Sequence, residues 1–239
     1  MSISKDEQKV LAARTAIDTL ISNGKIFSGM KIGLGTGSTA MPAVQRLYVR
    51  IADGTLKDVK AVVTSFQTSL ACEELGIPVY SLNDKVIGAH LDLTIDGADE
   101  IDVNNNLIKG GGAALLREKI VAYNSDNYAI VADESKSVKD LGTKFPLPVE
   151  IIPDARVSVI RELKKTGASC VLREGVKKAG PVITDNGNMI LDILWEKAVD
   201  SAEMEAKIDS ITGVVECGFF TKLKPTAFIA KADGSVEIR

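Results

Sequence analysis

The sequence predicts an α/β fold: a doubly wound, mostly parallel sheet (Rossmann-like) with a smaller ferredoxin-like α+β domain. Apolar runs of strand length alternate with amphipathic helical stretches as far as Ala132, as in parallel sheets covered by helices on both faces. After Phe145-Pro-Leu-Pro148 the expected order becomes strand, helix, two strands, helix and strand, which is the ferredoxin-like arrangement. The 239 residues suffice for one large domain or two small ones.

The alternation begins with an amphipathic helix. Its apolar residues recur at the spacing of one helical face, at Val10, Ala13, Ile17, Leu20 and Ile21. Strands are expected after it at 30–34, 59–63, 79–81, 91–95 and 128–132. Helices are expected from the glycines after residue 34 to about residue 52, where Asp53-Gly54 ends the helix, and then at 67–75 and 113–122.

The second part of the chain predicts strands at 149–152, 169–173, 182–184, 189–193 and 214–217, and helices after Pro153 and at 202–211. Asp185-Asn-Gly-Asn188 lies between two of these strands and is a strong hairpin signal. The tail, 226–231 and 235–238 around Asp233-Gly234, predicts a final hairpin.

A glycine cluster, Gly33-Leu-Gly-Thr-Gly-Ser-Thr-Ala40, lies between an expected strand and an expected helix. Such a turn offers backbone N–H groups to a phosphate, together with the hydroxyls of Thr36, Ser38 and Thr39. The alternative is a turn that only lets the helix and the strand pack closely.

Two sharper phosphate motifs fit this cluster less well. Gly35-x-Gly37-x-x-Ala40 formally matches the dinucleotide fingerprint, but the next strand ends in Thr64-Ser65 and not in an acidic residue that would hold a ribose. A P-loop would end in Gly-Lys-Ser/Thr, which this cluster lacks. The sequence therefore favours a small phosphorylated ligand over NAD or ATP.

The most informative segment joins Asp96-Gly-Ala-Asp-Glu100, Lys109-Gly-Gly-Gly112 and Glu118. An expected strand leads into it and an expected helix leads out, so the carboxylates and the lysine come to a strand-end crevice, where open α/β sheets bind ligands. Three glycines at a helix start would leave N–H groups to face an anion or a developing oxyanion. The alternative, a solvated acidic turn followed by a loose loop, is weakened by the combination with Lys109 and Glu118.

Composition excludes several other classes of function. The net charge is −3, 5% of residues are aromatic and no basic stripe exists, so nucleic-acid binding has little support. The charged N-terminal segment and the absence of a long apolar run predict no signal peptide and no membrane span. The three cysteines are expected to be reduced, buried thiols of a cytoplasmic protein. One histidine, His90, and no Cys/His cluster give little basis for a metal site or a Cys–His pair.

Six segments resemble, in order, the ribose-5-phosphate isomerase type A family, and the resemblance covers essentially the whole chain. They are Gly35-Thr-Gly-Ser-Thr-Ala40, Thr64-Ser-Phe-Gln-Thr68, Asp96-Gly-Ala-Asp-Glu100, Lys109-Gly-Gly-Gly112, Phe145-Pro-Leu-Pro-Val-Glu150 and Pro181-Val-Ile-Thr-Asp-Asn-Gly-Asn188. The resemblance implies a discontinuous catalytic domain, 1–141 with 223–239, and a second domain, 142–222. It also implies interconversion of D-ribose 5-phosphate and D-ribulose 5-phosphate through an enediolate, with no cofactor or metal, by a homodimer or homotetramer.

The resemblance assigns roles to particular residues. Glu118 would be the base, about two turns into its helix, and partial burial would suit a base that works near neutral pH. Lys109 and the N–H groups of Gly110, Gly111 and Gly112 would stabilise the oxyanion. Asp96 and Asp99 would hold sugar hydroxyls, and Asp99 with Lys109 would move the ring-opening proton. The remaining substrate contacts would be Thr36, Gly37, Ser38 and Thr39 at the phosphate, Gly97 and Ala98 in the acidic loop, and Lys136, with Lys9 a weaker phosphate candidate.

Two other functions compete with this interpretation. A related sugar-phosphate isomerase or a lactonase commonly relies on a histidine, whereas His90 lies outside the motifs. A non-catalytic sugar-phosphate sensor would keep the glycine cluster but has no need of the carboxylate–lysine–carboxylate set.

Overall fold

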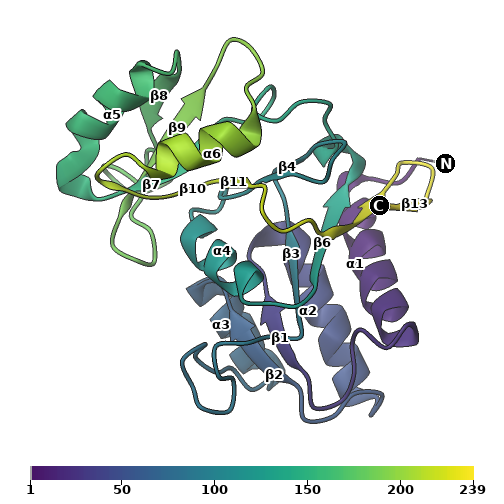
Figure 1. Ribbon diagram of the computed structural model, residues 1–239. Helices are drawn as coiled ribbons and strands as arrows, with labels where there is room; N and C mark the ends of the chain where they lie inside the picture. Colours follow the sequence, from purple (N-terminus) through teal and green to yellow (C-terminus); the bar gives the residue numbers. More distant parts are fainter. Residues whose placement is uncertain (1) are drawn as a thin grey trace. The chain divides into compact units, whose positions relative to one another are not determined.

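The computed structural model describes residues 2–239, which group by their contacts into two units (Figure 1). Unit 1 contains the chain up to Ala98, together with Arg117–Ser137 and Leu223–Arg239. Unit 2 contains Asp99–Leu116 and Val138–Lys222. Among residues 2–239, no helix has both the length and the apolar character needed to cross a bilayer.

Unit 1 is built on a six-stranded sheet in the order β13-β12-β6-β3-β1-β2. Five neighbouring strands run parallel, and the edge strand β13 pairs antiparallel with β12, which confirms the expected mostly parallel sheet. The C-terminal hairpin therefore completes the sheet of the first unit. The strands are β1 (Lys31–Leu34), β2 (Lys60–Val63), β3 (Leu93–Gly97), β6 (Tyr128–Asp133), β12 (Thr226–Ala230) and β13 (Val236–Ile238).

Helices cover both faces of this sheet, so unit 1 is doubly wound. Successive residues of a strand point to opposite faces. Ala61 and Val63 of β2 accordingly pack in the main core with apolar residues of α1 and α2, whereas Val62 packs on the other face with Val121 of α4. The helices are α1 (Lys5–Ser22), α2 (Gly37–Ala52), α3 (Phe66–Leu75) and α4 (Leu115–Tyr123).

The carboxyl ends of the parallel strands meet at one edge of the sheet, where open α/β sheets bind ligands. Residues 35–39 follow β1, Thr64-Ser65 follow β2, and Asp96 lies near the end of β3. A short 3₁₀ helix, η1 (Glu134–Lys136), follows β6. The fold thus brings four of the segments singled out in the sequence to the same edge.

Unit 2 contains a four-stranded antiparallel sheet in the order β10-β7-β9-β8. In chain order this is fourth, first, third, second, with one helix after the first strand and one after the third, which confirms the ferredoxin-like arrangement. The elements are β7 (Leu147–Ile151), η2 (Pro153–Ala155), α5 (Arg156–Lys164), β8 (Ser169–Leu172), β9 (Met189–Leu194), α6 (Ser201–Asp209) and β10 (Val214–Cys217).

A second, three-stranded sheet in unit 2 has no counterpart in the sequence-based expectations. It is formed by β4 (Glu100–Ile101), β5 (Leu107–Ile108) and β11 (Phe219–Phe220). Its strands have two residues each, too few to show a period of alternation. Because β5 pairs with β11, the residues from Asp99 to Leu116 group with unit 2. The predicted domains, 1–141 with 223–239 and 142–222, differ from the contact groups there and stay a prediction.

Two expected strands are reduced to isolated bridges, at Val79 with Ala61 and at Ile183 with Met189. At the second of these, the Thr184 hydroxyl accepts the N–H groups of Asn186 and Asn188, and the Thr184 N–H donates to the Asn188 carbonyl at 2.9 Å. The helix expected at 113–122 begins instead at Leu115.

Candidate active site

The 35–39 turn of unit 1 is built around the fully buried carboxylate of Asp96. Oδ1 of Asp96 accepts the N–H of Thr36 at 3.1 Å and the N–H of Gly97 at 2.7 Å. A Cβ atom on Gly35 would lie 1.8 Å from the same oxygen, so only glycine allows this approach. Asp96 therefore joins the end of β3 to the turn that follows β1.

The side chain of Thr36 belongs to a network of buried hydroxyls. Its Oγ1 lies 2.7 Å from Thr64 Oγ1 and 2.7 Å from Ser65 Oγ, and Thr68 Oγ1 donates to the Gly35 carbonyl at 2.7 Å. These partners come from Thr64-Ser-Phe-Gln-Thr68, to which the sequence analysis gave no structural role at the turn. The Thr36 hydroxyl fixes the turn to the start of α3, and its contact with a phosphate stays a prediction.

The first turn of α2 lies where the sequence predicts a phosphate site, and that role stays a prediction. Gly37, with φ of +92°, begins the helix, and Ser38 and Thr39 follow it. The first N–H groups of a helix lack intrahelical acceptors, and the helix dipole favours negative charge there. Gly37 N–H donates to Gln67 Oε1 at 3.1 Å, which adds a residue that the sequence analysis did not single out.

Lys9 lies at this helix start. Its Nζ is 3.4 Å from Ser38 Oγ and 2.9 Å from Asp6 Oδ1. One residue earlier, Gln8 Oε1 accepts the N–H of Glu134 at 3.2 Å, which ties α1 to η1 and so to the segment that carries Lys136. Two lysines that are far apart in the sequence are thus carried by segments that are tied together near the carboxyl edge of the sheet.

Glu118 is buried, with 4% of its surface exposed, and lies in the first turn of α4. The expectation of two turns into the helix is wrong, because α4 begins at Leu115. Its neighbour Arg117 donates from Nη2 to the Val63 carbonyl at 3.4 Å and lies 5.8 Å from the centre of the Phe66 ring. Arg117 therefore fixes this end of α4 to the carboxyl end of β2.

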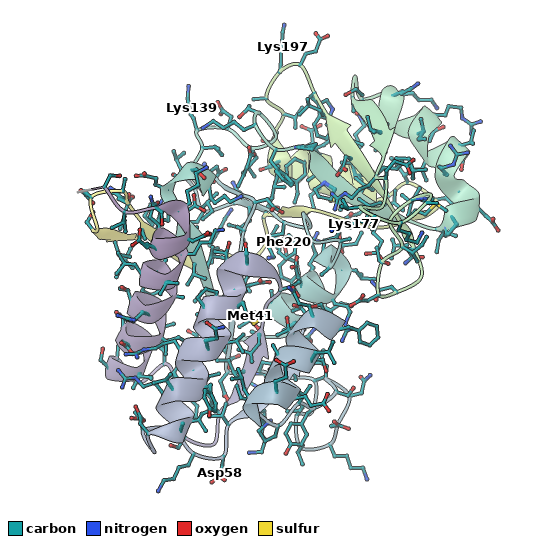
Figure 2. The ribbon with its side chains drawn as sticks, turned by 180° about the vertical axis from the view of Figure 1, so that it is seen from behind. Met41, Asp58, Lys139, Lys177, Lys197 and Phe220 are labelled. Carbon is teal, nitrogen blue, oxygen red and sulfur yellow. The ribbon has the colours of Figure 1, made fainter. Side chains whose placement is uncertain are left out.

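Unit 2 carries Asp99, Lys109 and the 109–112 turn. Asp99 Oδ2 accepts the Gly111 N–H at 2.7 Å, and a Cβ atom on Gly111 would lie 2.6 Å from Asp99 Oδ1. Lys109 is buried, and its Nζ lies 5.7 Å from the centre of the Phe220 ring, a residue labelled in Figure 2. The backbone N–H of Lys109 donates to the Gly218 carbonyl at 2.9 Å, so both the backbone and the ammonium end of this lysine have partners.

The expected glycine helix start is wrong in two respects. Gly110 has φ of +103° and Ala113 has φ of +58°, which excludes a regular helix there, and α4 begins only at Leu115. In addition, the N–H of Gly111 donates to Asp99. This turn is thus a separate structure that precedes the helix.

Glu100 is a buried anchor whose role the sequence analysis missed. Its carboxylate accepts the N–H groups of Gly142 at 2.6 Å, Lys144 at 3.1 Å and Phe145 at 2.8 Å. These bonds hold the 142–145 segment to the residue that follows Asp99. The signal was its place in the acidic motif, but its partners lie more than forty residues away.

The cysteines are reduced in this structure, and burial raises the pKa of the Cys72 thiol to about 11. One group of three possible metal ligands occurs among residues 2–239, at Asp209, Glu216 and Cys217. None of the predicted site residues belongs to that group.

A helix start with hydroxyls and a nearby lysine, a buried carboxylate tied to it, and a second buried carboxylate on α4 fit an α/β enzyme of the sugar-phosphate class. The family described as ribose 5-phosphate isomerase A (phosphoriboisomerase A) matches residues 60–234. The ribose-5-phosphate isomerase A of Treponema denticola is 59% identical over 99% of both chains, and that of Treponema pallidum is 53% identical over 97% of this chain and 92% of its own.

Solved structures agree with these relatives. The ribose 5-phosphate isomerase A of Methanocaldococcus jannaschii is 41% identical, with a TM-score of 0.89 over 99% of both chains. A D-ribose-5-phosphate isomerase solved in complex with phospho-erythronic acid is 39% identical, with a TM-score of 0.92 over 99% of both chains. This chain belongs to the ribose 5-phosphate isomerase A family.

Proposed function

We propose that this chain interconverts D-ribose 5-phosphate and D-ribulose 5-phosphate through an enediolate, as an aldose–ketose isomerase of the non-oxidative pentose phosphate pathway. The observation that carries the proposal is the buried Asp96 carboxylate bonded to the turn that begins α2. That bond couples a group able to hold sugar hydroxyls to a helix start able to hold a phosphate. The family membership identifies the reaction.

The phosphate is assigned to the start of α2. Its dianion would accept N–H groups of Gly37, Ser38 and Thr39 and the hydroxyls of Ser38 and Thr39. Lys9, 3.4 Å from Ser38, supports the assignment with a positive charge, and Lys136 is assigned as a further substrate contact. Thr36 contributes its backbone to the same turn.

Glu118 is assigned as the base. In the open-chain aldose it removes the proton from C2, the electron pair forms the C1–C2 double bond, and negative charge develops on O1. Return of the proton to C1, with transfer of the hydroxyl proton from O2 to O1, gives the ketose. Lys109 and the N–H groups of Gly110 and Gly112 are assigned to the charged oxygen, whereas the N–H of Gly111 donates to Asp99. Burial of Glu118 supports its role, because it keeps water from the carboxylate.

Asp96 and Asp99 are assigned to the sugar hydroxyls, beside the backbone of Gly97 and Ala98. Opening of the furanose ring needs a proton moved from the anomeric hydroxyl to the ring oxygen. In this assignment Asp99 accepts the proton of the anomeric hydroxyl, and Lys109 donates a proton to the ring oxygen. No step requires a redox cofactor or a metal ion.

The deciding experiment is an assay of ribose 5-phosphate isomerisation in the presence of EDTA, with binding of the sugar phosphate titrated alongside. Turnover by the chelated protein supports the proposal. Binding without turnover would instead identify a sugar-phosphate sensor, and activity restored only by a divalent cation would make the acidic loop a metal site.

We also infer a homodimer or homotetramer and a cytoplasmic location. The three free cysteines support the location, and the oligomeric state is carried over from the sequence resemblance. Light scattering coupled to size-exclusion chromatography measures the oligomeric state, and a monomer at micromolar concentration would contradict it.

A further inference from the structure

The 109–112 turn is held by an arginine that the assigned chemistry does not use. Arg173 directly follows β8, and its Nη1 donates to the carbonyls of Gly110 at 2.9 Å and Gly111 at 3.0 Å. Its Nε donates to Asp192 Oδ2 at 2.9 Å, and its Nη2 donates to Asp192 Oδ1. Every nitrogen of the guanidinium therefore has a partner, and all of these groups lie within unit 2.

The two carbonyl bonds determine where the N–H groups of the turn point. The peptide bonds among residues 2–239 are all trans, and in a trans peptide the C=O and the N–H point in opposite directions. Because both carbonyls face Arg173, the N–H groups of Gly111 and Gly112 are both directed away from it. The position of Asp99, which accepts the Gly111 N–H at 2.7 Å, identifies that side.

Little else in the local backbone imposes this orientation. Gly110 has φ of +103°, and one backbone bond, from Ala113 N–H to the Gly110 carbonyl at 2.9 Å, closes the turn. Consecutive glycines have more conformational freedom to lose than any other residues. A fixed cation on two successive carbonyls removes that freedom where the direction of the N–H groups matters.

We propose that Arg173, oriented by Asp192, is a positioning residue for the isomerisation: it aligns two successive peptides so that one N–H orients Asp99 and the next faces the enediolate oxygen. This inference rests on the proposed function. Arginine suits the role because its planar fork binds a carboxylate with two nitrogens and still presents a third to the carbonyls. Lysine can reach one of these partners but cannot hold them together.

The test compares Arg173→Lys and Arg173→Ala with the wild-type protein. Each variant is assayed for kcat and KM with ribose 5-phosphate, and for competitive inhibition by phospho-erythronic acid and by inorganic phosphate. Phospho-erythronic acid presents a carboxylate whose charged oxygens resemble those of an enediolate, whereas inorganic phosphate reports only on the start of α2. Arg161→Ala is the matched control, because Arg161 is a largely exposed arginine of the same unit that pairs with Glu162 at 3.4 Å.

The expected loss is in kcat, by about 10- to 10²-fold, since misplaced donors act in the transition state while KM changes by less than about threefold. Affinity for phospho-erythronic acid should fall with kcat/KM, and affinity for inorganic phosphate should not change. Added guanidinium ion at millimolar concentration should restore part of the kcat of Arg173→Ala. Asp192→Asn should show a smaller loss of the same kind, and Arg161→Ala none.

Two results would overturn the inference. One is kcat within twofold of wild type in the arginine variants. The other is a loss that affects inorganic phosphate and phospho-erythronic acid equally and follows the melting temperature, because that pattern belongs to a general packing role. If Arg173→Ala does not fold, Arg173→Lys decides by the same criteria. Wild-type turnover together with an inactive Glu118→Gln would keep the proposed function intact even if Arg173 has no such role.

Discussion

The two glycine turns of this chain look alike in sequence and are built differently. The 35–39 turn continues directly into α2, so its N–H groups are aligned by the helix they begin. The 109–112 turn ends before α4 begins at Leu115, and its carbonyls are held by a side chain 63 residues away. A glycine cluster before a helix can therefore be oriented in two ways: by the helix that it begins, or by tertiary contacts from distant residues.

Gly35 in the first turn and Gly110 in the second meet different needs. At Gly35 the missing Cβ leaves room for a fully buried carboxylate. At Gly110 the residue supplies a backbone conformation with positive φ, which L side chains rarely adopt. The first turn is fixed by close packing and the second by hydrogen bonds from Arg173, so the two should respond differently to substitution.

The largest expected effect follows from removing the base on α4. This change tests proton transfer without altering either glycine turn. Glu118→Gln keeps the size of the side chain but cannot accept the proton, so kcat should fall by about 10²- to 10⁴-fold. Inhibition by inorganic phosphate should be unchanged, because the start of α2 is untouched. Steady-state assays give both values, and near-wild-type kcat would remove Glu118 from the mechanism.

The next effect tests whether the 35–39 turn alone holds the phosphate. Ser38→Ala with Thr39→Ala removes two hydroxyl donors to a dianion and should lower kcat/KM for ribose 5-phosphate by roughly 10²- to 10³-fold. Turnover of free D-ribose, already orders of magnitude slower, should change little. Thr55→Ala, which removes an exposed hydroxyl just after α2, is the control. Equal losses for both sugars would show that the turn is only structural.

A smaller effect compares the two turns directly. Gly35→Ala places a methyl group 1.8 Å from a carboxylate oxygen that has no room to move, and overpacking of this kind costs about 1–3 kcal/mol. Gly111→Ala meets Asp99 Oδ1 at 2.6 Å and should cost less. Denaturant unfolding of both variants measures the difference. A larger loss of stability for Gly111→Ala would reverse the comparison.

The smallest effect uses cysteines as reporters. Burial raises the pKa of Cys72, on α3 behind the first turn, to about 11, and raises the pKa of Cys170, on β8, with partial opposition from Lys164. Both thiols are therefore protonated at neutral pH, and alkylation should accelerate as the pH rises. Because Cys170 is only partly buried, mass spectrometry should detect its alkylation before that of Cys72. Cys72 should stay unlabelled in the native protein, so alkylation should cause no loss of activity through Cys72. Rapid labelling of Cys72 at pH 7 would contradict this expectation.

The features that the sequence predicted are set locally, and those that it missed depend on tertiary contacts. The alternation of strands and helices, the ferredoxin-like order and the start of α2 are set by local patterns, and the structure confirms them. The hydroxyl network of Thr36, the bonds of Glu100 and the clamp of Arg173 join residues that no local pattern connects. The false start of α4 has a related cause, since helix periodicity in 113–122 does not reveal that Ala113 adopts a positive φ.

The position of β12 has a consequence for how the protein is made. This strand, Thr226–Ala230, pairs in parallel with β6, whose six residues are all buried. Until β12 emerges from the ribosome, β6 is the edge of an unfinished sheet, and its unpaired backbone N–H and C=O groups are open to pairing with other chains. The Val138–Lys222 part of unit 2, which holds its four-stranded antiparallel sheet, is synthesised in between and can form that sheet first. Synthesis in order along the chain thus leaves the first unit to be completed last, by a strand that arrives after the whole of the second.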